Sequence, residues 1–183
     1  CNMVILISDA FDKSLPKKLS VFGEVTEDTS RIAEADVILI RSKTKATKEY
    51  IDSAKNLKLI IRGGVGMDNI DRKYCEEKGI IATNTPKSSA PAVAEMAFAL
   101  MLSTASKVCF FDRTMKEGEW AKKTKRTELL GKKLALLGFG NIARQVAVRA
   151  KAFGMEIQAY DPYVKESDLA TLKPTVEEAV KNA

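Results

Sequence analysis

The sequence KLALLGFGNIARQVAVRAKAFGMEIQAYD, residues 133–161, decides the fold of this chain. It contains a short apolar run at 133–137, a turn with two glycines, a helical stretch at 141–153 and a second apolar run at 156–160. Short continuous apolar runs are typical of strands that are buried on both faces. A strand, a helix and another strand in this order predict a βαβ unit with a parallel sheet.

The turn between the first strand and the helix has the composition of a dinucleotide-binding loop. It reads Gly138-Phe139-Gly140-Asn141-Ile142-Ala143, in which the first glycine permits a tight turn and the second lets a pyrophosphate approach the backbone. The N–H groups and the dipole of the following helix favour an anion at the same place. A turn that needs small residues only for packing is the alternative interpretation.

Asp161 follows the second strand of this unit. In dinucleotide-binding folds an acidic residue at this point accepts hydrogen bonds from both hydroxyls of the adenosine ribose. A 2′-phosphate would meet a like charge there. The sequence therefore predicts binding of NAD in preference to NADP.

The first half of the chain repeats the alternation of short apolar runs and helical stretches. This repetition predicts a second parallel sheet, so the whole chain is expected to be α/β. The expected strands cover 3–8, 37–40, 57–61 and 79–82, and the expected helices cover 15–22, 47–54 and 71–78.

The longest helical candidate, residues 90–116, lies between the two halves. Its apolar residues, Met96 and Leu100 among them, recur at a spacing of three to four, which predicts one amphipathic helix packed in a core. The segment 118–131 that follows is polar and basic, as is typical of a boundary region.

Composition places the chain among soluble globular proteins, with 45% hydrophobic and 30% charged residues. No run of apolar residues is long enough for a membrane span, so we expect no membrane partner. The three cysteines, Cys1, Cys75 and Cys109, lack metal-ligand spacing, which predicts free thiols, no metal site and a reducing compartment such as the cytoplasm. Cys109 is expected to pack as a small hydrophobe.

The chain contains no histidine, which excludes histidine-based catalytic triads and zinc sites with histidine ligands. Its formal net charge is +6, and basic residues are dense at 122–126. No aromatic-rich strand or recognition helix accompanies this basic segment, so a solvated connector is favoured over nucleic-acid binding.

Two further loops have the character of anion-binding sites. Residues 41–45, RSKTK, form a cationic loop, and residues 62–71, RGGVGMDNID, form a glycine-rich one. Each follows an expected strand, and ligands of parallel sheets bind at the carboxyl ends of the strands. The glycine-rich loop is expected to bind a carboxylate or phosphate through backbone N–H groups, and a simple tight turn is the alternative.

Several motifs now carry a resemblance to a known family. They are Arg41-Ser42 with Thr44-Lys45, the segment 62–71, Asn84-Thr85-Pro86, Val93-Ala94-Glu95, Gly118-Glu119-Trp120 and the Gly138 loop. In order and spacing the chain resembles the D-isomer-specific 2-hydroxyacid dehydrogenase family. The resemblance implies a flavodoxin-like parallel-sheet substrate domain, residues 1–88, followed by the first βαβ part of a Rossmann NAD-binding domain, residues 89–183.

The resemblance also implies a substrate site in the first domain and an NAD site in the second. For the substrate, it implies Arg41 and Lys43 for a phosphate, the backbone of Gly64, Val65 and Gly66 for a carboxylate, and Asn84 as a lining residue of the cleft. For NAD, it implies Gly138, Phe139, Gly140, Asn141, Ile142 and Asp161.

The resemblance implies that the family's catalytic arginine, acidic residue and histidine lie downstream of Ala183, so no catalytic residue is expected in this chain. The chain is interpreted as the N-terminal part of a longer dehydrogenase. It is expected to be inactive alone. The complete enzyme is expected to oxidise D-3-phosphoglycerate to 3-phosphohydroxypyruvate in the first step of serine biosynthesis. An NAD-sensing corepressor of the same family is the alternative. The helix from Ala90 and Trp120 are expected to form a homodimer.

Overall fold

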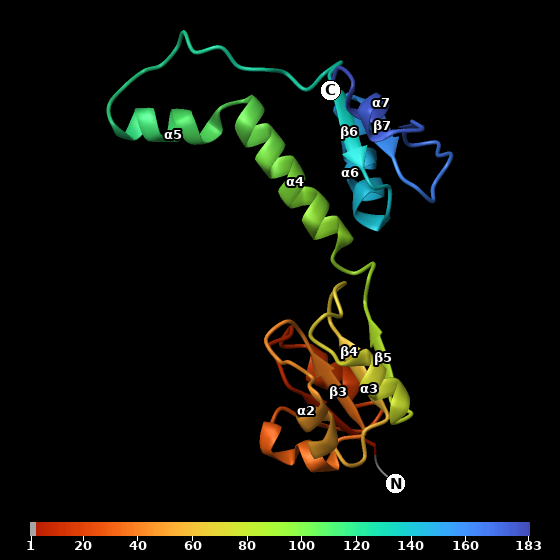
Figure 1. Cartoon of the computed structure of the whole chain (residues 1–183). Helices are drawn as coiled ribbons and strands as arrows, with labels where there is room; N and C mark the ends of the chain where they lie inside the picture. The colour runs from red at the N-terminus through yellow and green to blue at the C-terminus, as the bar shows by residue number, and fades with distance from the viewer. Residues whose placement is uncertain (1–2) are drawn as a thin grey trace. The chain divides into compact units, whose positions relative to one another are not determined.

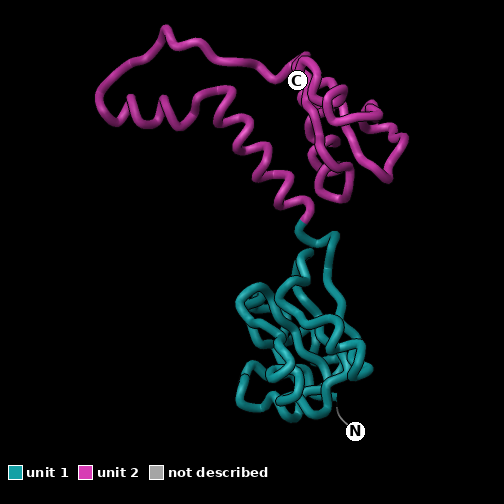
Figure 2. Tube along the Cα trace, in the orientation of Figure 1, with its two compact units in different colours: residues 1–89 teal, residues 90–183 magenta. Residues whose placement is uncertain are grey.

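The computed structural model describes residues 3–183. The chain divides between Ser89 and Ala90 into two compact units (Figures 1 and 2). Each unit has its own parallel sheet with helices packed against it, so the predicted α/β class is confirmed.

The first unit contains a five-stranded parallel sheet in the order β2-β1-β3-β4-β5. This is the strand order of flavodoxin-like folds, in which ligands bind where the order reverses or at the carboxyl ends of the strands. The expected strands are confirmed, although the last two begin two residues later than predicted, and the edge strand β2 was missed. The bounds are β1 Val4–Ile7, β2 Glu24–Thr26, β3 Val37–Ile40, β4 Leu59–Arg62 and β5 Ile81–Asn84.

The helices of the first unit begin where the sequence offers capping side chains. Thr47 accepts a hydrogen bond from the Tyr50 N–H, and Asp71 accepts one from the Tyr74 N–H, so both residues act as N-caps. The three expected helices are confirmed, although each is shorter than predicted, and a 3-10 helix was missed. The bounds are α1 Leu15–Leu19, η1 Thr29–Glu34, α2 Lys48–Ser53 and α3 Arg72–Glu77.

The second unit contains a three-stranded parallel sheet in the order β6-β7-β8. Strands β6 and β7 have the predicted bounds, and the fully buried Phe139 and Ala159 pack in one core with Phe98. The elements are β6 Lys133–Leu137, α6 Asn141–Ala152, β7 Glu156–Tyr160, β8 Thr171–Leu172 and α7 Val176–Val180.

The expectation of one helix over 90–116 is wrong. The segment forms α4, Ala90–Ala105, and α5, Val108–Lys116, which meet at an angle of 59°. Lys107 breaks the helix because its backbone is left-handed, with φ 56°.

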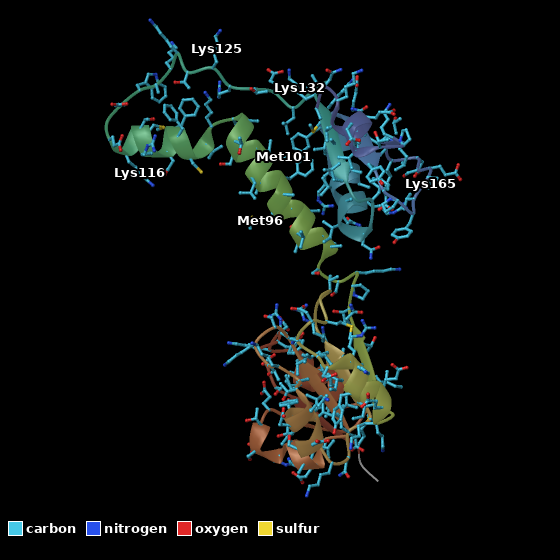
Figure 3. The ribbon with its side chains drawn as sticks, in the orientation of Figure 1. Met96, Met101, Lys116, Lys125, Lys132 and Lys165 are labelled. Atoms are coloured by element: carbon cyan, nitrogen blue, oxygen red, sulfur yellow. The ribbon has the colours of Figure 1, made fainter. Side chains whose placement is uncertain are left out.

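The buried side of α4 also differs from the prediction. Ala94 and Phe98 face the core and Met101 is half-buried against it, whereas the side chains of Met96 and Leu100 are 61% and 62% exposed (Figure 3). The expected apolar face is therefore wrong, because the buried side of this helix carries small alanines beside Phe98 while large apolar residues lie on its exposed side. Cys109 of α5 is exposed beside the Ser103 hydroxyl, which corrects the expectation that it packs as a hydrophobe.

Within the described part of the chain, no single helix has both the length and the apolar composition of a membrane span. The bent pair α4 and α5 meets that test only when the two helices are counted together.

Candidate functional site

The three segments expected at the substrate site end neighbouring strands of the first unit. Ile40 of β3 pairs with Arg62 of β4, and Arg62 pairs with Asn84 of β5. The cationic loop, the glycine-rich loop and Asn84 therefore meet at one edge of the sheet, as predicted from their positions after parallel strands.

The cationic loop presents Arg41 and Lys43 with exposed side chains. The Arg41 guanidinium donates through Nη1 to the Ala10 carbonyl at 3.3 Å and lies 5.9 Å from the ring centroid of Phe11. Among residues 3–183, neither cation forms an ion pair. Two adjacent cations without a carboxylate partner are suited to bind a dianionic group such as a phosphate.

Asp9, which sequence reasoning missed, lies beneath this loop. Its carboxylate accepts hydrogen bonds from the Arg41 N–H, the Thr44 N–H and the Thr44 hydroxyl. Partial burial alone would raise the pKa of Asp9, but the Thr44 hydroxyl and the two amides together hold it below its ordinary value. The signal that could have found Asp9 is its place directly after the first strand.

The glycine-rich loop is fixed to the end of β5. The Gly64 N–H donates to the Thr85 hydroxyl at 2.9 Å, and the Thr85 N–H donates to the Gly64 carbonyl at 3.0 Å. The backbone of Gly64 has φ +143°, a conformation that residues with a side chain rarely adopt, and a side chain there would displace the guanidinium of Arg62. Gly64 is therefore required by the turn, and its amide is already engaged.

The remaining amides of the loop are open. No acceptor among the described residues binds the N–H groups of Val65 and Gly66. Asn84 donates through Nδ2 to the Val65 carbonyl at 2.6 Å, so it supports the loop while its own amide oxygen is unused. Of the three glycine-loop amides expected to hold a carboxylate, the structure leaves Val65 and Gly66 available.

The Gly138 loop of the second unit leaves a free helix N-terminus. Gly138 turns with φ +91°, and its N–H donates to the Tyr160 carbonyl at 2.8 Å. Helix α6 begins after Gly140 without a side-chain cap. Its first internal bond runs from the Arg144 N–H, so the amides of residues 140–143 have no acceptor in the described structure. Such a terminus favours an anion.

Asp161 lies beside this loop, but its carboxylate is engaged. Oδ2 accepts from the Phe139 N–H at 2.7 Å, and Oδ1 accepts from the N–H groups of Tyr163 and Val164. The Phe139 amide and then the other two hold the pKa of Asp161 below its ordinary value. Because a carboxylate offers about four lone-pair sites, one remains for a ribose hydroxyl, where the prediction had two contacts.

The other residues expected to bind the cofactor differ in their exposure to solvent. Gly140, Asn141 and Ile142 are exposed at the start of α6, whereas the side chain of Phe139 is fully buried. Phe139 therefore supports the loop from the core. Elsewhere in residues 3–183, no three acidic or thiol side chains gather where they could hold a metal ion.

Comparison with known proteins places this arrangement in a family. A family model described as the catalytic domain of D-isomer-specific 2-hydroxyacid dehydrogenases matches residues 5–182. The chain belongs to this family. The resemblance predicted from the motifs is thereby confirmed.

Curated members of the 2-hydroxyacid dehydrogenase family cover most of the chain. It is 54% identical over 139 residues to a hydroxypyruvate reductase of Thermotoga maritima, covering 75% of this chain and 45% of that protein. It is 44% identical over 169 residues to a D-3-phosphoglycerate dehydrogenase of Methanocaldococcus jannaschii, covering 87% of this chain and 32% of that protein. The chain therefore spans less than half the length of these relatives.

Solved structures share the fold of this chain. The TT0316 protein of Thermus thermophilus superimposes with a TM-score of 0.85 at 28% identity, covering 99% of this chain and 62% of that one. A D-lactate dehydrogenase of Aquifex aeolicus, solved with NAD and lactic acid, has a TM-score of 0.79 at 28% identity, with 98% and 58% coverage.

Proposed function

We propose that the complete protein containing this chain oxidises D-3-phosphoglycerate to 3-phosphohydroxypyruvate with NAD. The observation that carries the proposal concerns Arg41 and Lys43, which are exposed and form no ion pair within residues 3–183. They lie at the sheet edge that also holds the open amides of Val65 and Gly66. The cations suit the substrate phosphate and the amides suit its carboxylate. A substrate held at both ends presents the C2 hydroxyl between them.

The second unit supports the choice of NAD. The uncapped N-terminus of α6 suits a pyrophosphate, and the Asp161 carboxylate beside it would repel the 2′-phosphate of NADP. When bound, NAD accepts the hydride from the substrate C2. The hydroxyl proton requires a group that titrates near neutral pH, and this chain has no histidine to supply one.

An unphosphorylated substrate is the second candidate, because a hydroxypyruvate reductase is among the similar relatives. The cationic loop favours the phosphorylated substrate over this one. The same loop favours an enzyme over an NAD-sensing corepressor, which has no need of a phosphate site.

We also propose that the protein is a homodimer. Helices α4 and α5 and the segment after them expose several large apolar side chains, and exposed apolar surface of this kind is typical of protein–protein interfaces. These side chains are Val93, Met96, Leu100, Val108, Met115 and Trp120.

The deciding experiment measures NADH formation by the purified complete protein with D-3-phosphoglycerate and with D-glycerate. We expect a higher kcat/KM for the phosphorylated substrate. Equal or higher kcat/KM with D-glycerate would contradict the phosphate assignment, and no NADH from either substrate would contradict the proposed reaction. The 183-residue chain, assayed in parallel, is expected to form no NADH.

A further inference from the structure

We propose that Asp9 and Asn69 are positioning residues that hold the cationic loop, residues 41–45, in the conformation that presents Arg41 and Lys43 to an anionic ligand. The inference rests on the proposed function, because it assigns how the phosphate end of that site is built. Neither residue was singled out by the sequence motifs as a partner of this loop.

The loop is held by a symmetrical set of hydrogen bonds at its two ends. The N–H groups of Arg41 and Thr44 both donate to Oδ2 of Asp9, at 2.6 and 3.1 Å. The carbonyls of the same two residues both accept from Nδ2 of Asn69, at 2.6 and 2.8 Å. The Thr44 hydroxyl adds a bond of 2.6 Å to Oδ1 of Asp9. The backbones of Arg41 and Thr44 are thus fixed, and Ser42 and Lys43 lie between them in the chain, with exposed side chains.

The two residues that hold the loop lie in segments that follow two different strands. Asp9 follows β1, which neighbours β3 in the sheet, and Asn69 lies in the glycine-rich loop after β4 on the other side of β3. The segment that carries Asp9 also directs the Arg41 side chain, since Ala10 accepts from its guanidinium and Phe11 lies beneath it. A shift of Asp9 would therefore move both the backbone and the head group of Arg41.

The chemistry of Asp9 shows why the cations stay available. A carboxylate beside Arg41 and Lys43 could pair with them, yet within the described residues Asp9 forms no ion pair and accepts hydrogen bonds only from neutral amides and a hydroxyl; the charge of Lys43 acts on it without a direct contact. An ionised carboxylate is acceptor-only, which matches three donors. An asparagine at this position is neutral, so its bonds to the two amides lose their charge assistance, and its NH₂ group would require the Thr44 hydroxyl to accept where it now donates.

The test compares variants of the complete protein in steady-state oxidation of D-3-phosphoglycerate. Asp9→Asn is expected to raise KM for this substrate about tenfold, as for loss of hydrogen bonds to a charged group, while kcat and the KM for NAD stay unchanged. Asn69→Asp, which places acceptors against two carbonyls, is expected to act in the same direction. Thr44→Val is expected to raise KM by a smaller factor. Thr44→Ser keeps the hydroxyl and is expected to have the wild-type KM.

Asp12→Asn is the matched control. Asp12 lies three residues from Asp9 and bonds only to Ser14 in its own turn, so the same charge change there should leave the KM unaltered. If Asp9→Asn leaves KM for D-3-phosphoglycerate within about twofold of the wild-type value, the positioning role is wrong. The role is also wrong if the variant lowers kcat and raises KM for NAD by as much as it raises KM for the substrate. Should Asp9→Asn fail to fold, the Thr44→Val and Thr44→Ser pair decides in its place, with equal KM values contradicting the proposal.

Failure of the proposed function is recognised separately. A wild-type protein that does not oxidise D-3-phosphoglycerate contradicts the substrate assignment, and the loop is then tested with inorganic phosphate added to the 183-residue chain. Phosphate is expected to shift the Arg41 side-chain NMR signal in the wild type and to do so at about tenfold higher concentration in Asp9→Asn. Equal titrations, or no shift in the wild type, would overturn the positioning role.

Discussion

The carboxylate of Asp161 accepts a 2.7 Å hydrogen bond from the backbone N–H of Phe139, which ties the end of β7 to the turn that precedes α6. The acidic residue expected to select the cofactor is therefore also part of the loop that would bind the pyrophosphate. Substitutions at position 161 should change two properties at once, the preference between cofactors and the geometry of the loop.

The first prediction concerns this preference. The wild-type complete protein is expected to bind NAD at least about tenfold more tightly than NADP, a difference of about 1.4 kcal/mol. Asp161→Ala should reduce the ratio of NAD affinity to NADP affinity, because the repulsion of a 2′-phosphate disappears. It should also weaken the binding of NAD, because the loop loses the hydrogen bond that holds it. Fluorescence titration with both cofactors measures the effect. Asp168→Ala is the control, because Asp168 is exposed and its carbonyl accepts from Lys151 near the end of α6 opposite the loop, so the ratio should stay unchanged. An unchanged ratio in Asp161→Ala would refute the assignment.

The second prediction concerns the substrate phosphate. Arg41→Ala should weaken binding of D-3-phosphoglycerate by about 2 to 4 kcal/mol, because a charge-assisted contact is lost. Binding of D-glycerate should change much less. Arg72→Ala removes an exposed arginine of α3 and serves as the control. Equal losses with both substrates would make Arg41 a structural residue.

The third prediction concerns acid stability. Asp36 accepts from the Val4 N–H and from Lys58 Nζ, at 2.9 and 3.1 Å, and these bonds hold its pKa below the ordinary value. Its stabilising contribution is therefore fully present above roughly pH 3.9, the unfolded value, and is lost as the pH falls through the lower folded pKa.

Asp36→Asn should accordingly cost about 1 kcal/mol of unfolding free energy near neutral pH, and the difference from wild type should shrink below the unfolded pKa. Urea unfolding of the 183-residue chain at several pH values measures it. Asp68→Asn, whose carboxylate bonds to none of the described residues, should match the wild type. A difference that grows on acidification would contradict this assignment.

The fourth prediction concerns association. Leu100→Glu should convert the proposed dimer to a monomer, because a charge would be buried at the interface without a partner. Val148→Glu, which alters an exposed apolar residue of α6, is the control and should leave the dimer intact. Sedimentation velocity over a range of concentrations distinguishes the species, and a dimeric Leu100→Glu protein would place the interface elsewhere.

The elements predicted well from sequence are those whose burial is complete. Strand β3 has four buried apolar residues in a row and was predicted with its observed bounds. Edge strand β2 was missed, because Glu24 is exposed and only Thr26 of its three residues is buried. The break at Lys107 was also missed, since no glycine or proline marks it.

The candidate site was also predicted only in part. The loops that carry glycine or charge motifs could be located from the sequence, and the sheet topology brings those of the first unit to one edge. The supporting contacts of Asp9 and Thr85 could not, because each joins residues far apart in the chain and depends on strand order. The roles of the located residues in binding stay predictions until the variants above are measured.

Two hydrogen bonds within the protein hold the Gly138 loop: the Gly138 N–H donates to the Tyr160 carbonyl, and the Phe139 N–H donates to the Asp161 carboxylate. The conformational entropy of this loop is consequently lost when the protein folds, and none of that loss is deferred to the moment of binding. A nucleotide would meet a rigid, prearranged set of amides. Its association should then be limited by diffusion and orientation, with no slow step in which the loop first becomes ordered.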